Sequence, residues 1–139
     1  MPTNRSMPPG SIIPELAYSD VRAAAAWLCE AFGFRERLRI ADHRVQLTYG
    51  AGSLVVIERP AGAMPDLVSH VTLVSVSDID RHHQRAASRG AKIVRPPTDY
   101  PYGERQYSAE DPGGHRWTFS QTIADVDPAS WGGVLVRES

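Results

Sequence analysis

The stretch SDVRAAAAWLCEAFGF, residues 19–34, decides how this chain folds. Asp20 is a typical helix N-cap, because its side chain accepts a hydrogen bond from the first helical turn. Apolar residues then recur every three or four positions from Val21 to Phe32, which predicts a helix with one buried face. Gly33 favours the left-handed conformation in which many helices end. The stretch therefore predicts one helix with a defined start and stop.

Short strand-like segments surround this helix. One precedes it at 11–17, where Pro14 favours an edge position or a strand start. Three more follow it, separated by turn-forming residues, at 34–40, 43–49 and 53–58. The first half of the chain therefore has the order strand, helix and three strands, or βαβββ.

The same order returns in the second half. Asp78 follows Asp20 by 58 residues as a second helix cap, and Gly90 follows Gly33 by 57 as a second stop. The predicted elements of this half are a strand at 67–76, a helix running from the cap to about Ser88, and strands at 91–94, 104–108 and 115–121. Matching caps and stops at a nearly constant offset indicate duplication of one unit.

Two such units predict an α+β fold in which tandem βαβββ modules form a cupped, barrel-like mixed sheet with the helices on the outside. The length of 139 residues fits one such domain. The expected divisions are a flexible tail at 1–10, a domain at 11–121 with modules at about 11–60 and 66–121, and a C-terminal extension at 122–139. Trp131 in the extension is expected to dock on the domain or on a partner.

Composition excludes several classes of protein. The formal net charge of −1 gives no bulk attraction to nucleic acid or to an anionic membrane, so neither is expected as a partner. The single cysteine, Cys29, excludes an intrachain disulfide and a cysteine-rich zinc site. The longest apolar run, 23–29, is too short to span a bilayer. Because the first residues also carry no signal-peptide pattern, a cytoplasmic location is expected.

Three stretches carry a resemblance to a known family. They are the first helix with its exit, 20–34; the strand and cap HVTLVSVSD, 70–78; and the hairpin containing YGERQY and DPGGH, 102–115. In order and spacing they resemble the glyoxalase / bleomycin-resistance / extradiol dioxygenase (vicinal oxygen chelate) superfamily over about 11–121. The resemblance implies the cupped fold, a site for a small organic ligand in the cup, and a homodimer.

Metal-dependent members of that superfamily hold one divalent ion in the cup through His, Gln or Glu side chains. The resemblance places the four ligand positions on Ile13, Glu58, His70 and Thr118. Only Glu58 and His70 can serve as good ligands, and these two are also the candidate catalytic residues. Glu15 shares a strand face with Ile13, so Glu15, Glu58 and His70 form an alternative set. We therefore expect no cofactor, with Zn, Ni, Fe or Mn as the open alternative.

Tyrosines on or beside the cup strands suit a flat organic ligand, because each offers an apolar face and one polar group. Tyr49 fits a core position equally well, and Arg116 fits either an anionic ligand group or a nearby carboxylate. The predicted ligand-binding set is Ile13, Glu15, Tyr49, Glu58, His70, Tyr102, Tyr107, Arg116 and Thr118. His82 and His83 fall on a polar helix face and are expected to be solvated.

Three functions remain open. Loss of two metal ligands favours a binding protein that sequesters an organic molecule, as in the bleomycin-resistance branch. Retention of Glu58 and His70 favours a metal-dependent lyase, isomerase, epimerase or dioxygenase in which they act as ligands, acid or base. A regulatory protein that docks through the segment around Trp131 is the third hypothesis.

Overall fold

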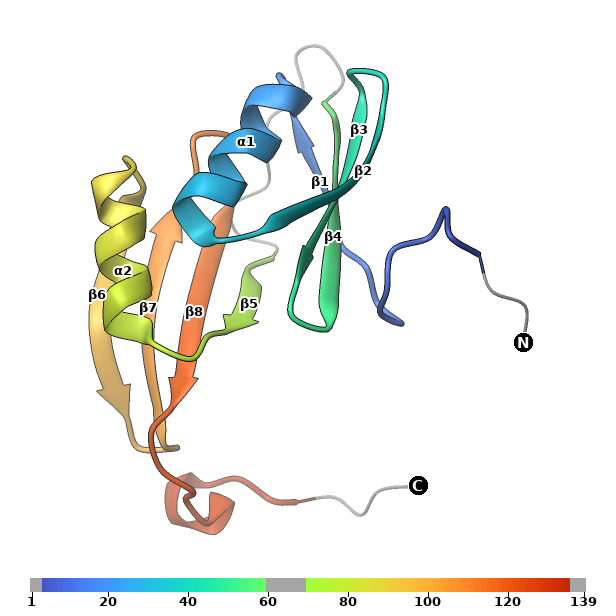
Figure 1. Ribbon diagram of the computed structural model, residues 1–139. Coiled ribbons are helices and arrows are strands. Elements are labelled where there is room, and N and C mark those ends of the chain that lie inside the picture. Colours follow the sequence, from blue (N-terminus) through green and yellow to red (C-terminus); the bar gives the residue numbers. More distant parts are fainter. Residues whose placement is uncertain (1–3, 60–69, 136–139) are drawn as a thin grey trace.

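The βαβββ order occurs twice in the computed structural model, which describes residues 4–59 and 70–135 (Figure 1). The first module contains β1 (Glu15–Tyr18), α1 (Val21–Phe32), β2 (Arg35–Ile40), β3 (Arg44–Tyr49) and β4 (Gly52–Glu58). The second contains β5 (Thr72–Ser75), α2 (Ile79–Ser88), β6 (Lys92–Tyr100), β7 (Glu104–Glu110) and β8 (Arg116–Thr122), and a 3₁₀ turn, η1 (Pro128–Trp131), follows. Neither helix is long and apolar enough to cross a membrane.

The two modules repeat each other down to the ends of their helices. Asp20 accepts a hydrogen bond from the amide of Ala23 at 3.0 Å, and Asp78 accepts one from Arg81 at 3.1 Å. After the helices, Gly33 and Gly90 take φ values of 85° and 90°, which residues other than glycine rarely adopt. The predicted duplication is therefore confirmed.

Each module forms its own four-stranded sheet. Sheet A has the order β1-β4-β3-β2 and sheet B the order β5-β8-β7-β6. The first strand of each module runs parallel to the last, across the helix, and the remaining pairs are antiparallel. The sheets are cupped and do not close into a barrel.

The limits of three strands differ most from the prediction. Strand β1 begins at Glu15 and not at residue 11. Strand β5 begins at Thr72 and ends at Ser75, within the predicted 67–76, of which positions 67–69 lie outside the described residues. Strand β6 continues to Tyr100, beyond the predicted end at 94, through Pro96 and Pro97. Its pairing shifts register there, and β6 is an edge strand, which is where a sheet tolerates proline.

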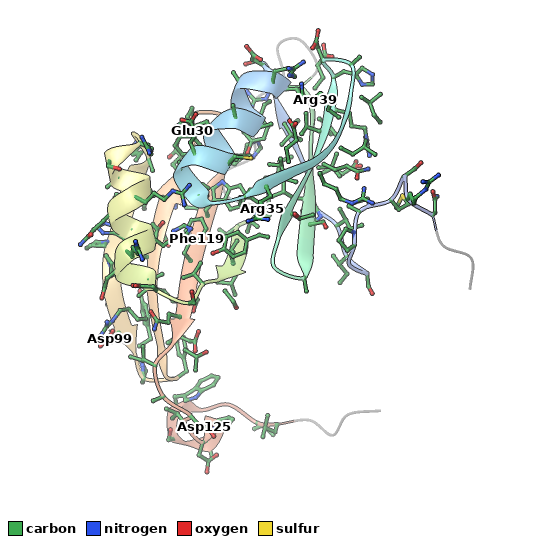
Figure 2. All side chains as sticks on the ribbon, viewed as in Figure 1. Glu30, Arg35, Arg39, Asp99, Phe119 and Asp125 are labelled. Carbon is green, nitrogen blue, oxygen red and sulfur yellow. The ribbon has the colours of Figure 1, made fainter. Side chains whose placement is uncertain are left out.

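The helix-covered faces of both sheets share one core (Figure 2). The ring centroid of Phe32, at the end of α1, lies 5.2 Å from that of Trp117 and 4.7 Å from that of Phe119. Both of these residues lie on β8 and are fully buried. Because side chains alternate along a strand, Thr118 between them lies on the opposite face, which no described helix covers. We call this second face of each sheet its open face.

A buried carboxylate fastens the modules together. Asp111 accepts hydrogen bonds from the Tyr18 hydroxyl at 2.5 Å and from the Trp117 indole at 3.0 Å. Its other oxygen accepts the backbone amides of Gly113 and His115, each at 3.0 Å. Burial first, and then the Asp111 charge, raise the pKa of Tyr18, so its proton stays in the contact.

The expectation that His82 is solvated is wrong. Its Nε2 lies 2.8 Å from the Phe32 carbonyl oxygen, which can only accept, so Nε2 carries the proton. Its Nδ1 then accepts from the Tyr107 hydroxyl at 2.5 Å. The ring centroid of His82 also lies 4.2 Å from that of Phe119. The face of α2 that carries His82 is polar in sequence but partly buried between the modules.

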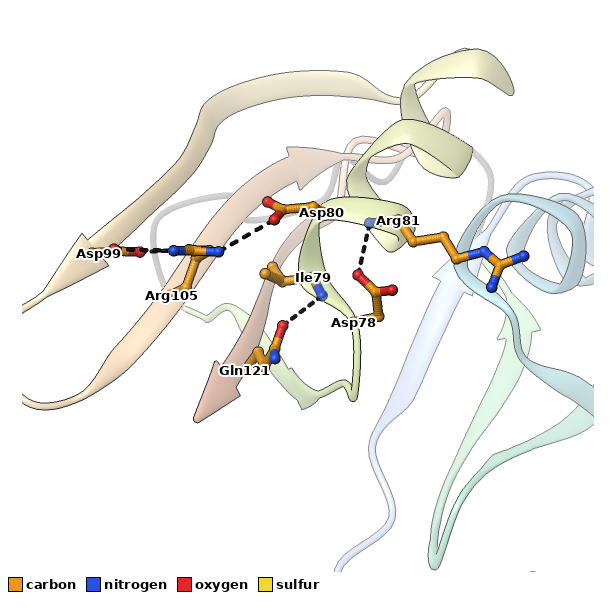
Figure 3. A network of polar contacts seen from close by, with 7 residues as sticks. All are labelled: Asp78, Ile79, Asp80, Arg81, Asp99, Arg105 and Gln121. Atoms are coloured by element: carbon orange, nitrogen blue, oxygen red, sulfur yellow. Dashed lines mark hydrogen bonds and ion pairs between the residues drawn. The ribbon is translucent and has the colours of Figure 1, made fainter. Parts of the chain in front are cut away.

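Ion pairs link α2 to the β6–β7 hairpin (Figure 3). Arg105 contacts Asp99 at 2.6 Å and Asp80 at 3.2 Å. Beside them, the Gln121 side chain accepts the Ile79 amide at 2.9 Å and so caps the first turn of the helix. Exposed pairs of this kind contribute little free energy, so the core, and not this network, holds the helix in place.

Candidate ligand-binding site

A groove of about 470 Å³ lies where the two modules meet. Its walls are strand β5, the β3–β4 turn and the segment before β1. Apolar side chains dominate its lining, among them Ile12, Pro14, Phe34, Leu54, Leu73 and Val74, while hydroxyls come from Tyr49, Ser53, Thr72 and Ser75. Burial raises the pKa of Tyr49, so its phenol stays protonated and can donate a hydrogen bond.

The rim of this groove is unusually apolar for a protein surface. Ile12 is 88% exposed, Leu73 is 64% exposed and Val71, which adjoins β5, is 48% exposed. Contiguous exposed apolar side chains usually mark a binding surface. The groove and its rim together form an apolar surface with a few hydroxyl groups.

The open face of sheet B adds a polar layer next to the groove. Ser108 and Thr118 share a hydrogen bond at 2.9 Å across β7 and β8. Further along, Gln106 donates to Ser120 at 3.0 Å, and Ser120 donates to Glu104 at 2.6 Å. Leu73 pairs in register with Thr118, so this layer and the apolar groove meet along β5.

Three of the predicted site residues lie in or beside this region. Tyr49 lines the groove, Thr118 belongs to the polar layer, and Arg116 lies two residues before Thr118 on the same strand face. The Arg116 Nε is buried and has no hydrogen-bond partner among the described residues. Ile13 itself is not in the lining, although its neighbours Ile12 and Pro14 are.

The predicted metal ligands do not converge. Glu15 pairs in register with Val55, whereas Glu58 pairs with Tyr18, so the two carboxylates lie on opposite faces of sheet A. Glu15 instead contacts Arg44 at 2.5 Å. Across residues 4–59 and 70–135, no three His, Cys, Asp or Glu side chains are grouped to hold a metal. The described residues therefore do not fit the superfamily's metal site.

The remaining predicted residues lie elsewhere. His70 is exposed just before β5, with its ring 6.2 Å from that of His115. Tyr107 is fully buried in the core beside His82, and burial raises the pKa of its hydroxyl. Tyr102 stacks on Tyr100 at the β6–β7 hairpin, and the centroid of its ring lies 5.5 Å from that of the Trp131 ring.

Sequence reasoning missed the apolar half of the site. In the run from Val71 to Val76, apolar residues occur on both strand faces, and the phase alone does not say which set is exposed. The structure pairs Thr72 with Trp117 on the helix-covered face, which leaves Leu73 on the open face. An apolar residue on each face of an edge strand was the available signal.

Comparison with known proteins identifies the family. A model of the Glyoxalase/Bleomycin resistance protein/Dioxygenase superfamily matches residues 12–119. The chain belongs to this superfamily, as the resemblance in its sequence predicted.

Two solved structures share this fold, and one further relative matches part of the sequence. TioX from Micromonospora sp. ML1 is 36% identical, with a TM-score of 0.70 over 82% of this chain and 100% of that chain. A glyoxalase-related enzyme from Fulvimarina pelagi is 19% identical, with a TM-score of 0.65 over 81% of this chain and 87% of that chain. An uncharacterized protein of Mycobacterium bovis is 35% identical over 54 residues, or 39% of this chain, a match spanning only 36% of that relative's length.

Proposed function

We propose that this protein binds a small organic molecule in the groove between its modules, without a complete metal site, and does so as a homodimer. The apolar groove of about 470 Å³ carries the proposal, since it has the size and lining typical of sites for small organic ligands. The hydroxyls of Tyr49, Thr118 and Ser108 supply the few polar contacts that orient such a ligand. The separation of Glu15 from Glu58 supports binding over metal-assisted chemistry.

The arrangement of the faces supports the homodimer. The modules of one chain join through their helix-covered faces, where Phe32 packs against Trp117. Their open faces therefore point away from the shared core, and one chain provides only one side of a cup. A second copy, placing its open face opposite, would enclose the ligand and cover the exposed Leu73 and Ile12.

The binding proposal is tested with the fluorescent apolar probe anilinonaphthalene sulfonate. We expect Leu73→Asn to weaken probe binding about tenfold, because it places an amide in the apolar rim. Val94→Asn is the matched control, since Val94 is also exposed but lies on β6 outside the groove lining. Equal affinities for the two variants would contradict the proposal.

The homodimer is tested separately by sedimentation velocity. The expected species has twice the chain mass of 15.3 kDa, and Leu73→Asn shifts it toward the monomer. A single species of 15.3 kDa at all concentrations would exclude a cup shared between copies.

A further inference from the structure

The open face of sheet A is buried although no described helix covers it. Val55 and Gln46 are neighbours in register on this face, and they are only 2% and 4% exposed. On the corresponding face of sheet B, Leu73 is exposed and Thr118 is half-buried. Something other than a helix therefore covers sheet A.

The covering segment is residues 4–10, which run along the side of sheet A opposite α1 (Figure 1). The Gln46 side chain donates to the carbonyl oxygen of Ser6 at 2.8 Å. Arg37 donates to the carbonyl oxygen of Arg5 at 2.8 Å and to the Gln46 side chain at 2.5 Å. Two side chains of the sheet thus bind two successive backbone carbonyls of this segment.

The segment also packs against the sheet. Pro8 is buried, although it lies in a stretch without regular secondary structure. Its flanking residues, Met7 and Pro9, are exposed, so Pro8 alone turns inward. Pro8 lies two residues after Ser6, whose carbonyl oxygen accepts the hydrogen bond from Gln46.

We infer that residues 4–10 form a strap that occupies the open face of sheet A and must be released before a second copy of the chain can reach that face. The inference rests on the proposed function only in naming this face as a wall of the cup. Within the described ranges, two side-chain hydrogen bonds from the sheet reach the strap's carbonyls, and Gln46 is the buried donor of the two. A segment held in this way opens at a small cost compared with unfolding of the core.

Thiol labelling measures the cover directly and needs no ligand. The reporter is Val55→Cys in a Cys29→Ser background, which removes the one native thiol. We expect deletion of residues 1–10 to speed modification of this cysteine at least tenfold. Gln46→Ala in the full chain should speed it about fivefold, because it removes one of the two hydrogen bonds between the sheet and the strap.

Ser108→Cys, half-buried on the open face of sheet B, is the matched control. Its labelling rate should not change when residues 1–10 are deleted, and circular dichroism should show the same secondary structure in all variants. An unchanged labelling rate at position 55 in both the deletion variant and Gln46→Ala would overturn the inference that residues 4–10 cover this face. So would an equal rise at positions 55 and 108, which would mean that the deletion loosens the whole molecule. The labelling experiment does not use anilinonaphthalene sulfonate. If Leu73→Asn did not weaken binding of that probe, only the proposed function would be overturned.

Discussion

At the scale of single residues, the contacts between the modules depend on a few buried or half-buried polar groups. His82 is one of them, because both ring nitrogens are used: one donates to Phe32 and the other accepts from Tyr107. Burial is the main reason that the pKa of His82 lies below its ordinary value, and the charge of Arg85 lowers it further. A protonated ring could not accept from Tyr107, so the neutral form belongs to the folded state.

We therefore expect stability to fall as His82 is driven to protonate. Its contribution is complete above the unfolded-state pKa of about 6.5 and is lost as the pH falls from there toward the lower folded-state pKa. Urea unfolding at pH 7.5 and 5.5 measures this loss. His82→Asn should lower stability by about 1–3 kcal/mol at pH 7.5 and flatten the pH dependence, whereas His43→Asn, at an exposed turn, should leave the stability at pH 7.5 unchanged.

Asp111 gives a second prediction at this scale. Replacing it with alanine leaves the Tyr18 hydroxyl and the Trp117 indole buried without an acceptor. Asp111→Ala should therefore cost about 3–5 kcal/mol in the free energy of unfolding. Asp125→Ala, at an exposed position, should change it by less than about 0.5 kcal/mol. A loss below 1 kcal/mol for Asp111→Ala would show that the hydrogen bonds of Asp111 to Tyr18 and Trp117 contribute little to the free energy of unfolding.

The sequence predicts the helices better than it predicts these contacts. Asp20, Gly33 and their counterparts in the second module act through their own backbone neighbourhood, so their roles follow from local sequence. The burial of His82 depends on Phe32, 50 residues earlier in the chain, which no local pattern reveals. The opposite faces of Glu15 and Glu58 follow from the register of β1 on β4, and a one-residue shift of β1 would place both carboxylates on the same face.

At the scale of elements, the start of β7 fixes the path of the C-terminal extension. Gly103 accepts hydrogen bonds from the amides of Ile123 at 2.8 Å and Ala124 at 3.3 Å. An added Cβ would lie 2.2 Å from the Ala124 carbonyl oxygen, and the φ value of 86° is unfavourable for alanine. The glycine is therefore required by the close approach of a second backbone segment.

Gly103→Ala should lower the free energy of unfolding by more than about 2 kcal/mol, since strain and the clash add together. Gly90→Ala is the matched control, because its φ is 90° but nothing lies within 4 Å of an added Cβ. It should cost only about 1 kcal/mol. Chemical denaturation compares the two, and equal losses would mean that the contact with Ala124 is not needed for stability.

At the scale of the whole molecule, duplication has not produced two independent units. Trp117 and Phe119 of the second module pack against Phe32 of the first, within a single core. Trp27 on α1 also donates to the carbonyl oxygen of Arg89 at 3.0 Å, beyond the end of α2. The modules repeat in sequence and geometry, but they bury their apolar surface jointly.

We therefore expect one cooperative unfolding transition. Tryptophan fluorescence and far-ultraviolet circular dichroism should give the same urea midpoint. Phe32→Ala should lower that midpoint for both signals, with a loss of about 3–5 kcal/mol. Two separate transitions, or a shift confined to one signal, would show that the modules fold on their own.

The polar layer on sheet B has a consequence for selectivity. Ser108, Thr118, Gln106 and Ser120 are already hydrogen-bonded to one another or to Glu104 before any ligand arrives. Side chains fixed in this way lose little conformational entropy on binding, so a matching molecule gains affinity through preorganisation. A mismatched molecule must break existing hydrogen bonds without replacing them. Under the proposed function, this face would discriminate against close analogues of the ligand as well as favour the ligand itself.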